Sequence, residues 1–165
     1  MVVKIRPIVF KDAASYRLCW DAIAKERRYL TEYEAPPLAS VRKAFRKILR
    51  NKTPFLVAVD GERVVGFVVV YRWGLPSLSH LVDLGMGLLP EYREIGLGTK
   101  LTARVLKMCR GKFDSVHLTV FEKNKRARKL YKNMGFELCG RIKKAVKGLA
   151  YGTDDLLAMQ KQIRR

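Results

Sequence analysis

Two glycines, Gly96 and Gly98, mark the part of the sequence best suited to bind a charged ligand. They follow an expected strand over residues 80–89 that ends at Pro90, and an amphipathic helix is expected to begin directly after them. Glycines let a backbone turn tightly against a ligand, and the first turn of a helix presents unpaired N–H groups and a positive dipole end. This arrangement predicts a diphosphate site, with Arg93 as an additional charged contact.

The same spacing argues against two other phosphate sites. No Gly-Lys-Ser/Thr follows the glycine pair, as a P-loop requires, and the third glycine of a dinucleotide-binding fingerprint is missing. Metal and disulfide sites are not expected either. The chain has two histidines, and its cysteines are odd in number and widely spaced. Cys19 and Cys109 fall in helical apolar patterns and are interpreted as small buried hydrophobes.

Three segments resemble the GNAT superfamily of N-acetyltransferases. Residues 92–98, Tyr-Arg-Glu-Ile-Gly-Leu-Gly, resemble its diphosphate signature, Arg/Gln-x-x-Gly-x-Gly/Ala. Residues 84–90 resemble its splayed fourth strand, and residues 118–136 resemble its second signature, Asn-x-x-Ala-x-x-Leu-Tyr-x-x-x-Gly-Phe. The signatures stand in the family's order and spacing, and the resemblance covers the chain, more weakly before Asp60. It implies an enzyme that transfers an acetyl group from acetyl-CoA to an amine.

The resemblance also implies where the cofactor binds. The fourth strand pairs its backbone with the pantetheine arm, the glycine loop holds the diphosphate, and Asn124 both caps its helix and contacts the arm. Many relatives have glycine in place of Glu94, so its carboxylate must point away from the diphosphate. The cofactor-binding residues expected on this basis are Gly87, Leu88, Leu89, Arg93, Glu94, Ile95, Gly96, Leu97, Gly98, Thr99, Asn124 and Tyr131.

Tyr131 has two interpretations. By helical spacing it shares a face with Ala127, Leu130 and Met134, which predicts a core residue. The resemblance instead places it beside the thioester sulfur. There a phenol with a pKa of ~10 can protonate a leaving thiolate with a pKa of ~8.5.

Attack by an amine also needs a free lone pair. Deprotonating a lysine-like amine at pH 7 costs roughly 4–5 kcal/mol, and an α-amine about 1.4 kcal/mol, so a general base is expected. Asp83 matches an acid that many relatives carry and is favoured, although a strand-end aspartate bonded to backbone or lysine is the alternative. His80, with an ordinary pKa of ~6.5, is the second candidate. Direct attack in a ternary complex is expected, because no cysteine or serine lies beside an evident base.

The amine acceptor is expected between the first two helices and the last hairpin. Glu26, Glu32 and Glu34 concentrate negative charge around the break between those helices, in a chain poor in acids. We interpret them as candidate substrate residues that recognise a cationic amine. Surface salt bridges with Arg27 or Arg42 are the alternative interpretation.

The net charge of +19 is the most unusual bulk property. It predicts attraction to polyanions, which include a phosphate-bearing cofactor, an acidic protein, a ribosomal particle and RNA. Two alternatives to the enzyme follow: a basic RNA- or ribosome-associated binding module, and an inactive acyl-CoA sensor. Basic residues of the second signature are candidates for the 3′-phosphate of coenzyme A: Lys125, Arg128, Lys129 and Lys132.

The remaining expectations concern location and architecture. A charged N-terminus and the lack of long apolar runs predict a cytoplasmic protein with no membrane partner. A monomer and a homodimer are both compatible with the sequence. One domain over residues 1–165 is expected, with an α/β (α+β) GNAT fold in which about four helices flank a mixed sheet of about seven strands. The expected strands cover 2–10, 55–59, 64–71, 80–89, 116–120, 136–142 and 151–162, and the helices about 13–30, 38–49, 98–110 and 124–134.

Overall fold

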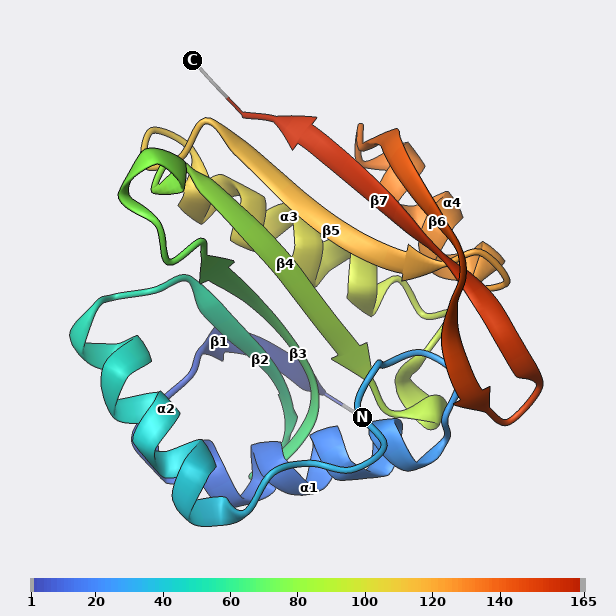
Figure 1. Ribbon diagram of the computed structural model, residues 1–165. Coiled ribbons are helices and arrows are strands. Elements are labelled where there is room, and N and C mark those ends of the chain that lie inside the picture. Colours follow the sequence, from blue (N-terminus) through green and yellow to red (C-terminus); the bar gives the residue numbers. More distant parts are fainter. Residues whose placement is uncertain (1, 164–165) are drawn as a thin grey trace.

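The computed structural model describes residues 2–163. A seven-stranded mixed sheet in the order β1-β2-β3-β4-β5-β7-β6 forms its centre, with helices on both faces (Figure 1). Its strands are β1 (Val3–Pro7), β2 (Phe55–Asp60), β3 (Arg63–Arg72), β4 (Leu81–Leu88), β5 (Ser115–Phe121), β6 (Glu137–Leu149) and β7 (Gly152–Gln162). The α-helices are α1 (Ala13–Lys25), α2 (Leu38–Arg50), α3 (Leu97–Cys109) and α4 (Lys125–Asn133). The mixed sheet and flanking helices expected from the sequence are confirmed.

The core lies around β2 and β3, which α1 covers on one face and α3 on the other (Figure 1). Val57, Val65 and Val68 are completely buried there, as continuous apolar strands between two helical layers require. Each fully buried valine contributes on the order of 1.5–3 kcal/mol through burial. Gly61 and Glu62 form the tight turn between the two strands, and Gly61 adopts a φ of 59°.

The feature that creates a site is the separation of β4 from β5. The two strands pair in parallel only from Leu81 to Asp83 on β4 and from Ser115 to His117 on β5. Beyond these residues β4 remains paired with β3, and β5 with β7. The strands therefore part at Asp83 and His117 and leave an opening between their C-terminal ends.

The expected end of the first helix is wrong. The helix was expected to reach Leu30, yet α1 ends at Lys25 and Arg27 has a φ of 49°. The chain leaves the helix there because Glu26 is bonded to Arg93, far along the sequence. Asp12 does not cap α1 through its side chain. Its carboxylate accepts the Val9 N–H at 2.9 Å and binds Arg6 instead.

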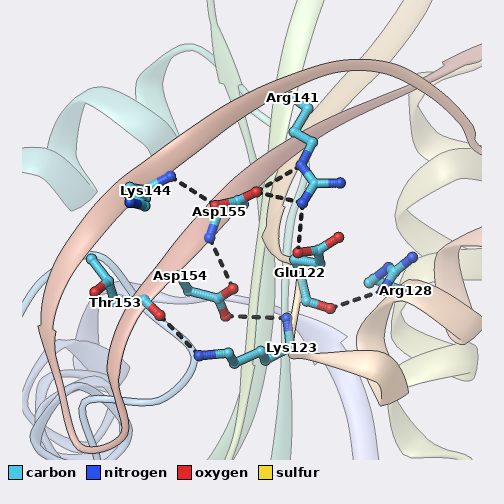
Figure 2. A network of polar contacts seen from close by, with 8 residues as sticks. All are labelled: Glu122, Lys123, Arg128, Arg141, Lys144, Thr153, Asp154 and Asp155. Carbon is cyan, nitrogen blue, oxygen red and sulfur yellow. Dashed lines mark hydrogen bonds and ion pairs between the residues drawn. The ribbon is translucent and has the colours of Figure 1, made fainter.

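The last hairpin is longer than expected. Residues 143–148 were expected to form a loop, but β6 continues through them to Leu149, with register shifts against β7. Asp155 holds the irregular part: its carboxylate accepts the Lys144 N–H at 2.7 Å and pairs with Arg141 (Figure 2). A side chain thus replaces ladder hydrogen bonds where the register slips, and no sequence pattern announces that exchange.

Two other findings bear on the expectations from composition. Cys19 and Cys109 are buried free thiols, as expected, and burial raises the pKa of each. Within residues 2–163, no helix combines the length and the apolar character needed to span a lipid bilayer.

Candidate active site

A cavity of about 560 Å³ occupies the opening between β4 and β5. Its walls come from residues 83–88 of β4, residues 118–121 of β5, the loop before α3, and one face of α4. Residues 29–32, which follow α1, line a further part of the cavity together with α1 itself. One cavity therefore brings together segments from both halves of the sequence.

The glycine loop presents a row of free backbone donors to this cavity. None of the N–H groups of residues 94–99 has a hydrogen-bond partner within the described chain, and the first helical bond is from the Lys100 N–H to the Gly96 carbonyl at 3.1 Å. Gly96 has a φ of 77°, in the left-handed region that favours glycine. Gly98 packs closely: a Cβ there would lie 3.0 Å from Leu130 of α4. The loop and the helix dipole together form an anion site.

Arg93 is held by protein groups. Its guanidinium donates to both carboxylate oxygens of Glu26, at 2.9 Å and 2.5 Å, and its Nε donates to the Leu88 carbonyl at 2.9 Å. The Tyr29 ring lies 4.7 Å from the guanidinium carbon. Arg93 therefore clamps the end of α1 to the glycine loop, and its charge is balanced by Glu26.

Glu94 lies at the mouth of the cavity. It has a φ of 64°, unusual for a residue with a side chain, and its carboxylate is 2.8 Å from a guanidinium nitrogen of Arg126 on α4. Both side chains are largely exposed. The carboxylate is thus paired across the mouth with a basic residue, which lowers its repulsion toward an anion bound at the loop.

The start of α4 is fixed by a polar network that joins β5 to the last hairpin (Figure 2). Asn124 caps the helix by accepting the Ala127 N–H at 3.2 Å. The buried Asp154 accepts the Lys123 N–H at 3.1 Å, and Arg128 donates to the Glu122 carbonyl at 2.9 Å. These bonds set the direction in which α4 leaves β5, and with it the position of every side chain that α4 directs into the cavity.

Tyr131 is one of those side chains. It is buried against Phe136, with ring centroids 5.6 Å apart, and it also lines the cavity. Its hydroxyl has no hydrogen-bond partner among the described residues. Burial raises the pKa of Tyr131 well above its ordinary value, so the phenol stays protonated at neutral pH. Tyr131 is thus buried, as the core interpretation expects, and it also faces the cavity, while its place beside a thioester sulfur stays a prediction.

Asp83 and His80 lie in different surroundings. Asp83 is half-buried and lines the cavity where the strands part, and its carboxylate has no hydrogen-bond or ion-pair partner among residues 2–163. His117, its neighbour on β5, is bonded to Ser115 at 2.9 Å. His80 is exposed in the turn before β4 and does not line the cavity. The alternative of an aspartate tied to backbone or lysine does not describe Asp83.

The three candidate acceptor glutamates are also separated. Glu32 lines the cavity, whereas the carboxylate of Glu26 is committed to Arg93. Glu34 is exposed and is not part of the lining. The loop that carries them bridges to the last hairpin, because Tyr33 donates to the Lys147 carbonyl at 2.6 Å and the Ala150 N–H donates to the Arg27 carbonyl at 2.9 Å. These two bonds form a loop–hairpin arch, which joins the last hairpin to the segment whose residues 29–32 line the cavity.

Comparison with known proteins agrees with this geometry. The family model described as "Acetyltransferase (GNAT) family" matches residues 16–136. The chain belongs to this family. The L-amino acid N-acetyltransferase AaaT of Escherichia coli (strain K12) is 33% identical over 91 residues, which is 54% of this chain and 56% of the relative. N-alpha-acetyltransferase 50 of Danio rerio is 35% identical over 104 residues, 62% of each chain. The matches thus span less than two thirds of either relative.

A solved GNAT structure is similar over nearly the whole chain. The phosphinothricin acetyltransferase (Pat) of Sinorhizobium meliloti, in complex with AcCoA, superposes with a TM-score of 0.89 at 23% identity. The match covers 99% of this chain and 90% of that one. At this identity the likeness establishes the fold, and the predicted GNAT membership is confirmed by the family match.

The cavity gathers most of the cofactor-binding residues expected in this GNAT protein. Leu89, Ile95 and Leu97 are not part of the lining: Leu89 and Leu97 are buried, and the Ile95 side chain is exposed. The lining members of that set are Gly87, Leu88, Arg93, Glu94, Gly96, Gly98, Thr99, Asn124 and Tyr131.

Sequence reasoning missed Tyr71 and Thr119, which both line the cavity. Tyr71 lies opposite Asp83 in the β3–β4 ladder, and its ring extends over Gly85, where a Cβ would be 3.2 Å from it. Desolvation of the hydroxyl and the charge of Glu32 raise the pKa of Tyr71 to about 12. The signal was the glycine on the neighbouring strand, which leaves room for a ring from the strand beside it.

Proposed function

We propose that this chain transfers an acetyl group from acetyl-CoA to a primary amine by direct attack within a ternary complex. The observation that carries the proposal is the row of unpartnered N–H groups at residues 94–99, which opens into the same cavity as Asp83 and Tyr131. A diphosphate matches the donors of the row, and the splayed edge of β4 leaves backbone groups for the pantetheine arm. When bound there, acetyl-CoA supplies the activated acetyl group.

Asp83 is the proposed general base. It is an unpartnered carboxylate at the point where β4 and β5 part, so a water or an amine can reach it from the cavity. Removing a proton from an α-amine costs about 1.4 kcal/mol at pH 7, and from a lysine-like amine roughly 4–5 kcal/mol. Asp83 therefore contributes more to the reaction of an alkyl amine than to that of an α-amine.

Tyr131 is the proposed hydrogen-bond donor to the sulfur. A phenol with a pKa of ~10 gives up its proton to a thiolate with a pKa of ~8.5 at a cost of about 2 kcal/mol, and burial raises that cost. The phenol therefore stabilises the charge that develops on sulfur without needing to lose its proton. The proton released by the amine neutralises the thiolate at the end of the reaction.

The relatives suggest two kinds of acceptor. One is named for free L-amino acids and the other for the α-amine of proteins. Both are α-amines, and the α-amine of a peptide chain, with a pKa of ~8, needs only modest help from a base at neutral pH. We accordingly place the amine at the end of the cavity that Asp83 and Glu32 line.

The test is calorimetric binding of acetyl-CoA, followed by an assay for free thiol with a panel of amines. We expect saturable binding that Gly98→Val weakens at least about tenfold, because the added side chain pushes α3 away from α4. Gly74→Val is the matched control, since a Cβ at Gly74 meets nothing within 4 Å. Equal binding by both variants would contradict a diphosphate site at the loop.

The two alternatives give different results in the same experiments. An RNA- or ribosome-associated module predicts steeply salt-dependent RNA binding that Gly98→Val leaves unchanged. An inactive acyl-CoA sensor predicts acetyl-CoA binding without release of thiol for any amine. The arrangement of Asp83 and Tyr131 around one cavity favours the enzyme over both.

A further inference from the structure

We infer that the acceptor is a cationic primary amine that carries no carboxylate next to the amine. The inference rests on the proposed function and selects among its acceptors. It follows from how charge is divided along the cavity. Within residues 2–163, two carboxylates without a cationic partner, Asp83 and Glu32, stand at the acceptor end, whereas at the cofactor end Glu94 is paired with Arg126 and Lys129 adds a further cation.

The acceptor end holds two carboxylates. Asp83 lies at the apex of the opening without a partner, and Glu32 lies on the loop after α1, where its bond is with the neighbouring Thr31 hydroxyl at 3.1 Å. Burial raises the pKa values of Tyr16 and Tyr71, and the charge of Glu32, which lines the same cavity, adds to both shifts. In a chain with a net charge of +19, this end of the cavity is locally acidic.

Among the described residues that line the cavity, no free cation stands beside these two carboxylates. The lysine and arginine residues that line the cavity are Arg93, Arg126 and Lys129. Arg93 is neutralised by Glu26, and the other two lie on α4, at the cofactor end. A carboxylate on the acceptor would therefore face Asp83 and Glu32 with no positive group among the lining residues to receive it. Like-charge repulsion disfavours that arrangement, more at the half-buried Asp83 and less at the exposed Glu32.

The rest of the acceptor end is aromatic and aliphatic. Trp20, Tyr29, Leu30 and Tyr71 line it, and the Trp20 ring packs against Tyr16 in a tilted arrangement, with 5.8 Å between ring centroids. Such walls bind an apolar body and attract a cation to the ring faces. Together with the carboxylates they match an ammonium group attached to an apolar or amide-bearing body. A plain amine and the α-amine of a peptide chain share this chemistry.

The experiment compares acceptors that differ by one carboxylate. Values of kcat/KM with acetyl-CoA are measured for tyramine and tyrosine, tryptamine and tryptophan, and agmatine and arginine, with the corresponding amino acid amides as a third arm. We expect each amine to exceed its amino acid by at least about tenfold. Amides that exceed the amines would assign the acceptor to peptide α-amines, and the reverse result to free alkyl amines. Both results support the inference.

A charge reversal tests the cause. Glu32→Lys is expected to lower the ratio of amine to amino acid by about tenfold. Glu62→Lys, which makes the same change of net charge in the exposed β2–β3 turn, is expected to change that ratio less than about twofold. Amino acids that react as well as their amines, or equal ratios in the two variants, would overturn the inference while leaving the proposed function intact. Failure of acetyl transfer to every amine, despite acetyl-CoA binding, would overturn both.

Discussion

Replacing either partner of the Arg93–Glu26 clamp by glutamine is expected to destabilise the protein. The pair joins the end of α1 to the glycine loop through two hydrogen bonds, and its side chains are 14% and 21% exposed. A hydrogen bond to a charged group contributes about 1.5–3 kcal/mol, and a stranded charge is costly when it is mostly shielded from water. Arg93→Gln and Glu26→Gln should therefore each lower the free energy of unfolding by about 2–3 kcal/mol.

The double variant identifies the clamp as a unit. Because the two side chains lose one shared interaction, the double variant should be about 1–2 kcal/mol more stable than the sum of the single effects predicts. Urea unfolding at pH 7 measures the free energy of unfolding of the wild type, the two single variants and the double variant. Glu91→Gln is the control, because its pair with Arg63 is largely exposed and should contribute no more than about 1 kcal/mol.

Acetyl-CoA binding by the same variants distinguishes a clamp from a phosphate ligand. If Arg93 acts through Glu26, the two single variants should weaken binding by similar factors, since each loosens the loop alike. Additive effects on stability, within about 0.5 kcal/mol, together with weaker binding in Arg93→Gln alone, would refute the clamp and restore Arg93 as a ligand of the diphosphate.

Three further predictions concern the cavity, the arch and the fold. Tyr131→Phe should lower kcat about 10²-fold with unchanged calorimetric affinity for acetyl-CoA, and an unchanged kcat would exclude the phenol from the chemistry. Gly148→Ala should raise the acceptor KM and lower the free energy of unfolding by about 1–2 kcal/mol. The φ of Gly148 is 69°, and the new Cβ would collide with the Tyr33 hydroxyl. Wild-type values of both quantities would contradict the arch. Desolvation acts to raise the pKa of Asp12, but hydrogen bonds from Arg6 and the Val9 N–H leave it lowered. Its stabilising contribution is thus present above pH ~4 and is lost as pH falls through the folded-state pKa. Asp12→Asn should therefore make the free energy of unfolding, measured in urea, depend less on pH between pH 5 and pH 2. A pH dependence like that of the wild type would contradict this.

The sequence was informative wherever local chemistry decided the structure. The Asp-Gly turn, the apolar strands around Val65 and the glycine loop each follow from nearby residues, and the structure has all three. The boundaries that were wrong depend on distant partners. Glu26 ends α1 through Arg93, and Asp155 extends β6 through the Lys144 N–H. The spacing of Glu26 and Arg93 along the chain does not indicate that they pair, and the same holds for Asp155 and Lys144.

The candidate site followed the same rule. Gly96, Asn124 and Tyr131 belong to contiguous motifs, so their positions in one cavity could be expected from the sequence. Tyr71 and Thr119 enter it through the register of β3 against β4 and through the parting of β5 from β4. Strand register is a property of the assembled sheet, and it therefore became available only with the structure.

The loop–hairpin arch has a consequence for how acceptor preference can change among relatives. Its two bonds end on main-chain carbonyls, those of Lys147 and Arg27, so they survive replacement of either side chain. The arch is thus anchored independently of the neighbouring residues that line the cavity. Substitutions at Glu32 or Leu30 can therefore alter which amine binds without breaking either bond of the arch. Selectivity and architecture then depend on different groups within a few residues of chain.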